Sequence, residues 1–144
     1  MRLVTLALMW SIVCTAALAQ EGAGTSVWNG VYTEEQAKRG ELAYRQSCAN
    51  CHGPELEGAD MTPPLTGGNF MANWNDLTLG DLFERIRATM PLDKPGTLSR
   101  QQNADLVAFV LKANLWPAGT TELSRDLGAL KQIRIQSTRP ESKP

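Results

Sequence analysis

Cys48-Ala49-Asn50-Cys51-His52 is the stretch that decides how the rest of this chain is interpreted. Two thiols three positions apart lie on one face of a helical turn, because residues i and i+3 are neighbours there. Each thiol can add across one vinyl group of a haem, and the imidazole that follows can offer a nitrogen to the iron. The spacing C-x-x-C-H is typical of covalent c-type haem attachment. We therefore expect one haem c, bound through Cys48 and Cys51, with His52 as an axial ligand of the iron.

The two cysteines have three alternative roles: a thioredoxin-like redox pair, half of a zinc site, or a structural disulfide. A zinc site needs four ligands, whereas Cys48, Cys51 and His52 are the only Cys and His residues that follow Cys14. A thioredoxin-like pair is expected near a βαβ pattern, and the sequence has no such pattern. The structural disulfide stays open, and haem attachment is the favoured interpretation.

The first 19 residues have the features of a secretory signal peptide. Met1-Arg2 precedes an apolar run over residues 3–18, and Ala17-Leu18-Ala19 resembles a small-residue cleavage site. The run is short for a membrane span, which needs about 20 apolar residues, although an uncleaved anchor is an alternative. We expect cleavage after Ala19, a periplasmic protein and no membrane span after cleavage. Cys14 lies in the run and leaves with it.

The charge of the chain is nearly balanced, with 14 Lys and Arg residues against 15 Asp and Glu residues. Nucleic-acid binding requires a basic patch or stripe, and the sequence has none. We therefore expect no nucleic-acid partner.

Three helices are expected after the leader, each opened by a Thr or Ser cap. They span about residues 33–46, 78–89 and 99–113. Gly40 lies inside the first helix, where it favours close approach of a second helix, and Ala108 on the last helix is the candidate to meet it. Asn114 is expected to end the last helix in the left-handed conformation.

The segment from Gly53 to Trp74 is rich in Gly and Pro and is expected to be a long loop around a flat cofactor. In Pro63-Pro64-Leu65, a carbonyl can accept the Nδ1 proton of His52 and leave Nε2 for iron. We expect Pro64, Leu65 and Trp74 to contact the cofactor, and the indole N–H of Trp74 can reach a haem propionate.

The sixth ligand of the iron cannot be a second histidine of this chain, because His52 is the only one. A methionine thioether is a natural partner for haem iron and raises its reduction potential. Met90 follows a predicted helix and precedes Pro91, which would hold its backbone still, whereas Met61 and Met71 lie in the loop. We therefore assign Met90 as the second axial ligand. The alternative is an open sixth site or a methionine that fills the core.

Together these features resemble class I cytochromes c, notably the small single-haem domains associated with bacterial quinoprotein dehydrogenases. The motifs that carry the resemblance are Cys48-Ala49-Asn50-Cys51-His52-Gly53, Pro64-Leu65, Thr89-Met90-Pro91 and Pro95-Gly96-x-Leu98-Ser99. The resemblance implies an all-α cytochrome c fold, with three to four helices wrapped around one covalently attached haem and the first and last helices crossing. It also implies axial ligation by His52 and Met90 and electron transfer, not catalysis, as the function.

The expected organisation is a signal peptide over 1–19, a flexible N-terminal segment over 20–32, a cytochrome c domain over 33–116 and a C-terminal arm over 117–144 with a disordered end. The resemblance implies redox partners, which are a dehydrogenase, an oxidase or another cytochrome, and a chain that acts as a monomer or as a subunit of a redox complex. Two alternative functions remain. One is a haem-based sensor in which Met90 is displaced, and the other is a peroxidase-like haem protein, which commonly uses a second histidine.

Overall fold

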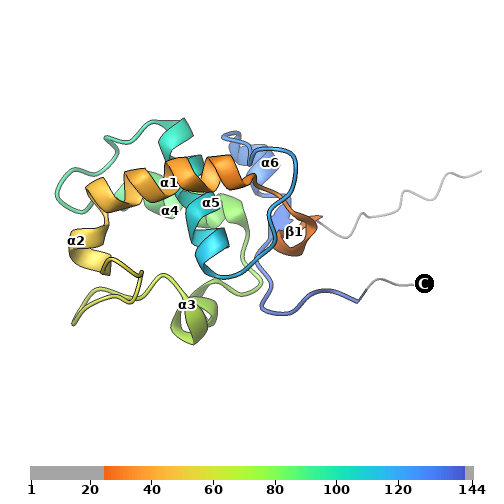
Figure 1. The fold of residues 1–144 in the computed structure, drawn as a ribbon, viewed down its shortest axis with the longest axis horizontal. Coiled ribbons are helices and arrows are strands. Elements are labelled where there is room, and N and C mark those ends of the chain that lie inside the picture. The colour runs from red at the N-terminus through yellow and green to blue at the C-terminus, as the bar shows by residue number, and fades with distance from the viewer. Residues whose placement is uncertain (1–24, 142–144) are drawn as a thin grey trace, which may run out of the picture.

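The structure is a computed structural model that describes residues 25–141. Helices dominate it, and the predicted all-α class is confirmed (Figure 1). The helices are α1 (Glu34–Ser47), α2 (Ala49–His52), α3 (Gly67–Trp74), α4 (Leu79–Thr89), α5 (Arg100–Ala113) and α6 (Leu127–Leu130), with one 3-10 turn, η1 (Val27–Asn29). Two short strands, β1 (Thr25–Ser26) and β2 (Ile133–Arg134), pair in parallel.

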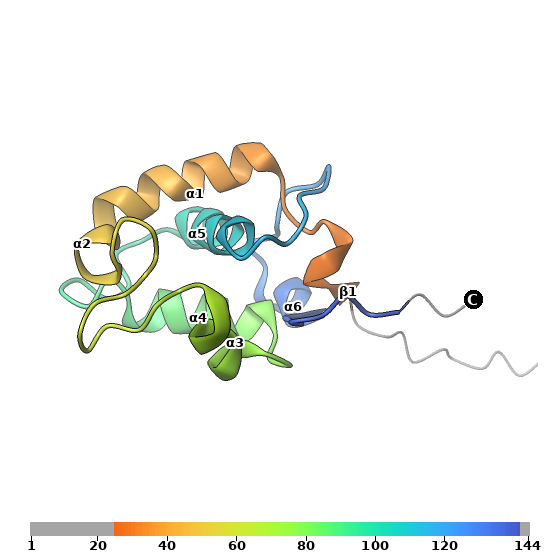
Figure 2. The same cartoon turned by 60° about the horizontal axis from the view of Figure 1, so that its bottom comes forward.

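Helix α5 forms the centre of the domain. It lies between α1 on one side and α4 on the other (Figure 2). Its buried apolar side chains are Ala104, Leu106, Val107, Ala108, Val110 and Leu111. A helix that is apolar over so much of its surface is stable only when other elements cover it.

Gly40 lies on α1 directly against the backbone of α5. A Cβ atom added to Gly40 would overlap the carbonyl oxygen of Asp105 and lie 2.9 Å from Cβ of Phe109. The predicted close helix approach is therefore confirmed, but its nearest atoms belong to Asp105 and Phe109 and not to Ala108.

The three predicted caps are confirmed, with one difference. Thr78 and Ser99 form complete capping boxes, and the Thr33 hydroxyl accepts a hydrogen bond from the Gln36 N–H. A return bond from the Gln36 side chain to Thr33, which would complete a capping box, does not form. Instead, Gln36 Nε2 donates to the Leu123 carbonyl at 3.0 Å, and Gln36 Oε1 accepts from the Leu123 N–H at 2.6 Å.

The loop expected from Gly53 to Trp74 contains a helix, α3, over its last eight residues. Helix propensity does not predict α3, because it starts with two glycines and glycine is a poor helix former. Phe70 is buried, and its ring stacks on that of Trp74 with 6.1 Å between the ring centroids. This tertiary packing stabilises α3.

The prediction of a left-handed Asn114 is wrong. Its φ and ψ are −88° and 12°, and the next residue, Leu115, has a φ of 64° instead. The Asn114 side chain makes hydrogen bonds to backbone groups, including the Leu65 carbonyl, which hold it in the conformation observed.

The N-terminal segment is packed where it was expected to be flexible, over the described part of residues 20–32. Val27 and Tyr32 are fully buried, and the Tyr32 hydroxyl donates to the Trp116 carbonyl at 2.7 Å. Buried apolar side chains fix this segment more strongly than its glycine content suggests. The predicted signal peptide, residues 1–19, and its cleavage site lie outside the described residues.

The chain after Pro117 folds back so that β2 pairs with β1 (Figure 1). The indole N–H groups of Trp28 and Trp116 both donate to the Gln136 carbonyl, at 2.9 and 3.1 Å. Two hydrogen bonds therefore hold Gln136, which is not part of a disordered end of the arm. Among residues 25–141, no helix is both long and apolar enough to cross a membrane.

Candidate haem-binding site

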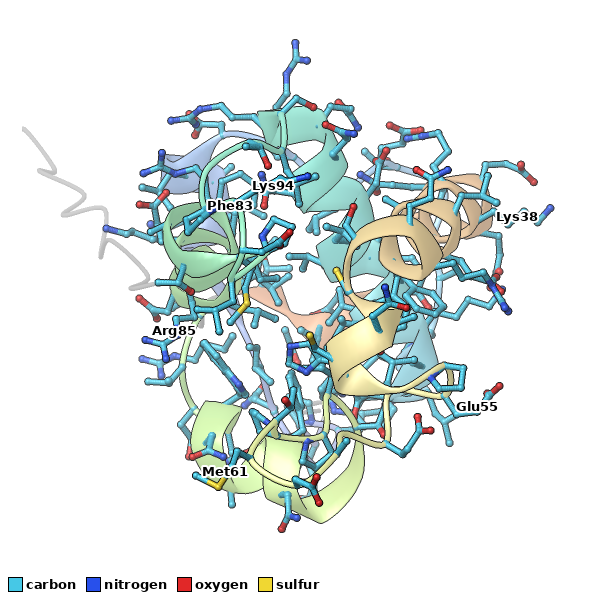
Figure 3. The ribbon with its side chains drawn as sticks, turned by 90° about the vertical axis from the view of Figure 1, so that its left-hand side faces the viewer. Lys38, Glu55, Met61, Phe83, Arg85 and Lys94 are labelled. Atoms are coloured by element: carbon cyan, nitrogen blue, oxygen red, sulfur yellow. The ribbon has the colours of Figure 1, made fainter. Side chains whose placement is uncertain are left out.

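A cavity of about 1060 Å³ opens between α2, the loop that follows it, α4 and α5. Figure 3 looks at this end of the molecule, with Glu55 on the α2 side, Phe83 and Arg85 on α4 opposite, and Met61 at the lower edge. All the cofactor-binding residues expected from the sequence line its wall, namely Cys48, Cys51, His52, Pro64, Leu65, Trp74 and Met90.

The two cysteines reach the cavity because α2 follows α1 directly. Cys48 joins the two helices, and Cys51 lies on the single turn of α2. Both are free thiols in the structure, so the disulfide alternative is not adopted here. Burial, with a smaller effect of Cys51, raises the pKa of the Cys48 thiol to about 11. The Cys48 thiol is therefore neutral at pH 7 before any bond is made to it.

The His52 side chain is held in place by burial and by a hydrogen bond. It is 8% exposed, and its Nδ1 lies 2.9 Å from the Pro63 carbonyl oxygen. A carbonyl can only accept, so Nδ1 carries the proton and Nε2 keeps its lone pair. The sequence predicted that the Pro63-Pro64-Leu65 segment would supply such an acceptor, and Pro63 supplies it.

The backbone around His52 is also held in place. The His52 carbonyl accepts from the Gly58 N–H at 2.7 Å, and the Gly53 carbonyl accepts from the Tyr44 hydroxyl at 2.6 Å. Burial raises the pKa of Tyr44 to about 12, so its hydroxyl remains a donor over the physiological range. These bonds fix the turn that aims the imidazole.

The three methionines among the described residues occupy different places. Met90 is half-buried in the cavity wall, where its N–H donates to the Ile86 carbonyl at 2.9 Å and ends α4. Met61 is 97% exposed at the cavity edge. Met71 lines a separate, smaller cavity. Met71 belongs to α3, so Met90 is the only one of the three that is partly buried in the wall of the larger cavity.

Other cavity residues were not assigned to the cofactor from the sequence. They include Tyr44, Leu82, Ile86, Leu106 and Val110. Four of them form pairs spaced four residues apart on α4 and α5, so the helical periodicity marked them as buried without indicating what they contact.

The wall of this cavity fits a haem. It offers two thiols, one imidazole with Nε2 free and two thioethers, Met61 at the edge and Met90 in the wall, on a mainly apolar surface, and these are known haem attachment and ligand groups. Among the residues from Thr25 to Glu141, no three His, Cys, Asp or Glu side chains gather into a group that could hold a bare metal ion.

Comparison with known proteins decides the family. The family model described as cytochrome c oxidase, cbb3-type, subunit III matches residues 35–110. The chain belongs to this family. It is a c-type cytochrome with covalently bound haem c and an electron-transfer function, and Cys48 and Cys51 have the required spacing. The single-haem cytochrome c resemblance and the cytochrome c fold are thereby confirmed.

Solved structures and curated proteins provide two further comparisons for this c-type cytochrome. The crystal structure of the sulfane dehydrogenase SoxCD from Paracoccus pantotrophus is similar to it with 21% sequence identity and a TM-score of 0.49, over 90% of this chain and 68% of that chain. A search of curated proteins gives no match.

Proposed function

We propose that this cytochrome is an exported single-haem electron carrier whose iron is bound by His52 and Met90. The observation that carries the proposal is that both side chains line one cavity, from α2 and from the end of α4, beside the two free thiols. Cys48 and Cys51 form the two thioether bonds, and His52 binds through Nε2.

The remaining residues of the site control the surroundings of the iron. The Pro63 carbonyl orients the His52 ring and increases the basicity of the imidazole. Pro64, Leu65 and Trp74 flank the cofactor, and the Trp74 indole N–H is the expected donor to a propionate. The bound haem supplies an iron that cycles between the ferric and ferrous states. Filled axial positions and an apolar wall favour electron transfer over ligand chemistry.

Export and partners belong to the same proposal. The charged start, apolar run and Ala17-Leu18-Ala19 site support a periplasmic protein cleaved after Ala19. N-terminal sequencing of the exported protein should begin at Gln20, whereas a retained Met1 would indicate an anchor. The matched family is described as an oxidase subunit, which supports a redox protein, either an oxidase or a dehydrogenase, as the partner. The family match at 35–110 supports a cytochrome domain over 33–116, with an arm over 117–144.

The ligand assignment is tested with three matched variants of the holoprotein. Met90→Ala should keep the covalent haem, lower the reduction potential and let carbon monoxide bind the reduced protein readily, because a thioether ligand is lost. Met61→Ala and Met71→Ala should leave both properties unchanged, because Met61 is almost fully exposed and Met71 lines the other cavity, whereas Met90 is half-buried in the cavity wall.

Two results would contradict the proposal. If Met61→Ala or Met71→Ala opens the iron to carbon monoxide and Met90→Ala does not, the sixth ligand is misassigned. If the unsubstituted reduced protein binds carbon monoxide readily, the sixth position is displaceable and the sensor alternative replaces the electron carrier.

A further inference from the structure

Asn114, the residue that ends α5, connects that helix to the loop between α2 and α3. Its Nδ2 donates to the Leu65 carbonyl at 2.9 Å and to the Val110 carbonyl of its own helix at 2.9 Å. Its Oδ1 accepts from the Gly67 N–H at 3.2 Å. One side chain thus bonds two backbone groups of a segment that lies 47 to 49 residues away in the chain.

The loop has few other means of attachment at this point. Pro63 and Pro64 have no N–H and cannot donate. The Leu65 N–H donates to the Leu56 carbonyl at 2.9 Å. Thr66 is the N-cap residue of α3 but makes no side-chain capping bond, so Asn114 Oδ1 accepts from the first N–H of α3 in its place.

The same loop carries the acceptor for the His52 ring. Pro63 lies two residues before Leu65, and its carbonyl accepts from His52 Nδ1. Helix α5 is buried at the centre of the domain, so Asn114 connects the loop to a helix that is packed on both sides. A shift of the loop at Leu65 would move the Pro63 carbonyl with respect to the imidazole.

We propose that Asn114 is a positioning residue for electron transfer: it holds the Pro63 carbonyl on His52 Nδ1 and so sets how strongly the imidazole donates to the iron. The inference rests on the proposed function, because it takes His52 as an axial ligand. A hydrogen bond from the second ring nitrogen makes a ligating histidine more basic. Weakening that bond reduces donation to the iron, which favours the ferrous state.

The test compares Asn114→Ala with Gln36→Ala, both as haem-loaded protein. Gln36 is a matched control, because its side-chain amide also bonds the N–H and C=O of a distant segment, at Leu123, but Leu123 does not line the cavity, whereas Leu65 does. Two quantities are measured: the exchange rate of the His52 Nδ1 proton by NMR of the reduced protein, and the reduction potential.

Asn114→Ala should exchange the Nδ1 proton about tenfold faster or more, because both hydrogen bonds to the loop are lost and each contributes roughly severalfold, and it should have a more positive potential. Gln36→Ala should lower the melting temperature while leaving both quantities at their wild-type values. Unchanged exchange and potential in Asn114→Ala would overturn the inference and leave Asn114 as a cap of α5. Equal changes in the two variants would also overturn it, because the effect would then follow stability alone.

A second variant covers the case in which Asn114→Ala does not fold. Asn114→Asp has the same shape and keeps the acceptor for Gly67, but it cannot donate to the Leu65 carbonyl. Faster Nδ1 exchange in Asn114→Asp supports the inference, and wild-type exchange overturns it. The added charge affects the potential directly, so only exchange is read for this variant. If the reduced wild-type protein shows no haem-shifted His52 ring protons, the proposed function fails before any variant is compared.

Discussion

Replacing Gly40 by alanine should destabilise the protein, because the methyl group has no room at the crossing of α1 and α5. The added Cβ would lie 2.5 Å from the carbonyl carbon of Asp105 and 2.9 Å from Cβ of Phe109. Carbon atoms pack best at about 3.5–4.0 Å, so the helices must separate by about 1 Å at this point. The nearest obstacle is backbone, which cannot turn away as a side chain does.

The size of the effect follows from two opposing terms. Overpacking of a core costs about 1–3 kcal/mol, and a backbone obstacle places Gly40→Ala at the upper end of that range. Alanine gains about 1 kcal/mol over glycine in a helix interior. The free energy of unfolding should therefore fall by about 2 kcal/mol, which lowers the melting temperature by about 8 °C for a domain of this size.

The assay is denaturant and thermal unfolding of the haem-loaded protein, with Gly68→Ala as the control. Gly68 lies in the first turn of α3, and a Cβ added there meets no atom within 4 Å. Gly68→Ala should leave the melting temperature unchanged or raise it slightly. If both variants melt at the same temperature, the close crossing described here is not what Gly40 provides.

Two further outcomes follow from charged groups. Hydrogen bonds from the hydroxyl and the N–H of Thr78 hold the pKa of Asp81 below its ordinary value of 3.8. The charged carboxylate therefore stabilises the folded protein above pH 3.8. This stabilisation is lost as the pH falls through the lower pKa of the folded state. Acid titration should therefore destabilise the wild type more than Asp81→Asn, and parallel curves would contradict this. Arg39 pairs through two nitrogens with Asp105, whose side chain is 7% exposed, so Arg39→Ala should cost about 2–3 kcal/mol, somewhat less than breaking a fully buried pair. Glu122→Ala breaks only the exposed bond of the same Arg39 and should cost at most about 1 kcal/mol in unfolding experiments.

The helices of this fold could be predicted where their signals are local. Thr33, Thr78 and Ser99 cap the helices expected from them, because a cap depends on atoms two or three residues away. Helix α3 could not be predicted in this way. It starts with Gly67 and Gly68, its N-cap residue makes no side-chain bond, and its first N–H is satisfied by a residue far along the chain.

The site also has features that local sequence predicts and features that it does not. The spacing of Cys48, Cys51 and His52 predicted a helical turn, and the structure places Cys51 and His52 on α2 with Cys48 as its N-cap residue. The proline-rich loop indicated where the ring proton of His52 would be accepted. Which carbonyl accepts it depends on the path of the loop, and that path depends on bonds from α5. Asn114 carried a signal for a helix end, but a side chain that bonds a segment nearly 50 residues away leaves no local pattern.

The most direct test of the central claim is the intact mass of the protein produced in a host that matures c-type cytochromes. The account predicts the mature polypeptide plus one haem that survives denaturation, and digestion should place it on the peptide that contains Cys48 and Cys51. A polypeptide of unmodified mass, with both thiols open to alkylation, would contradict the account.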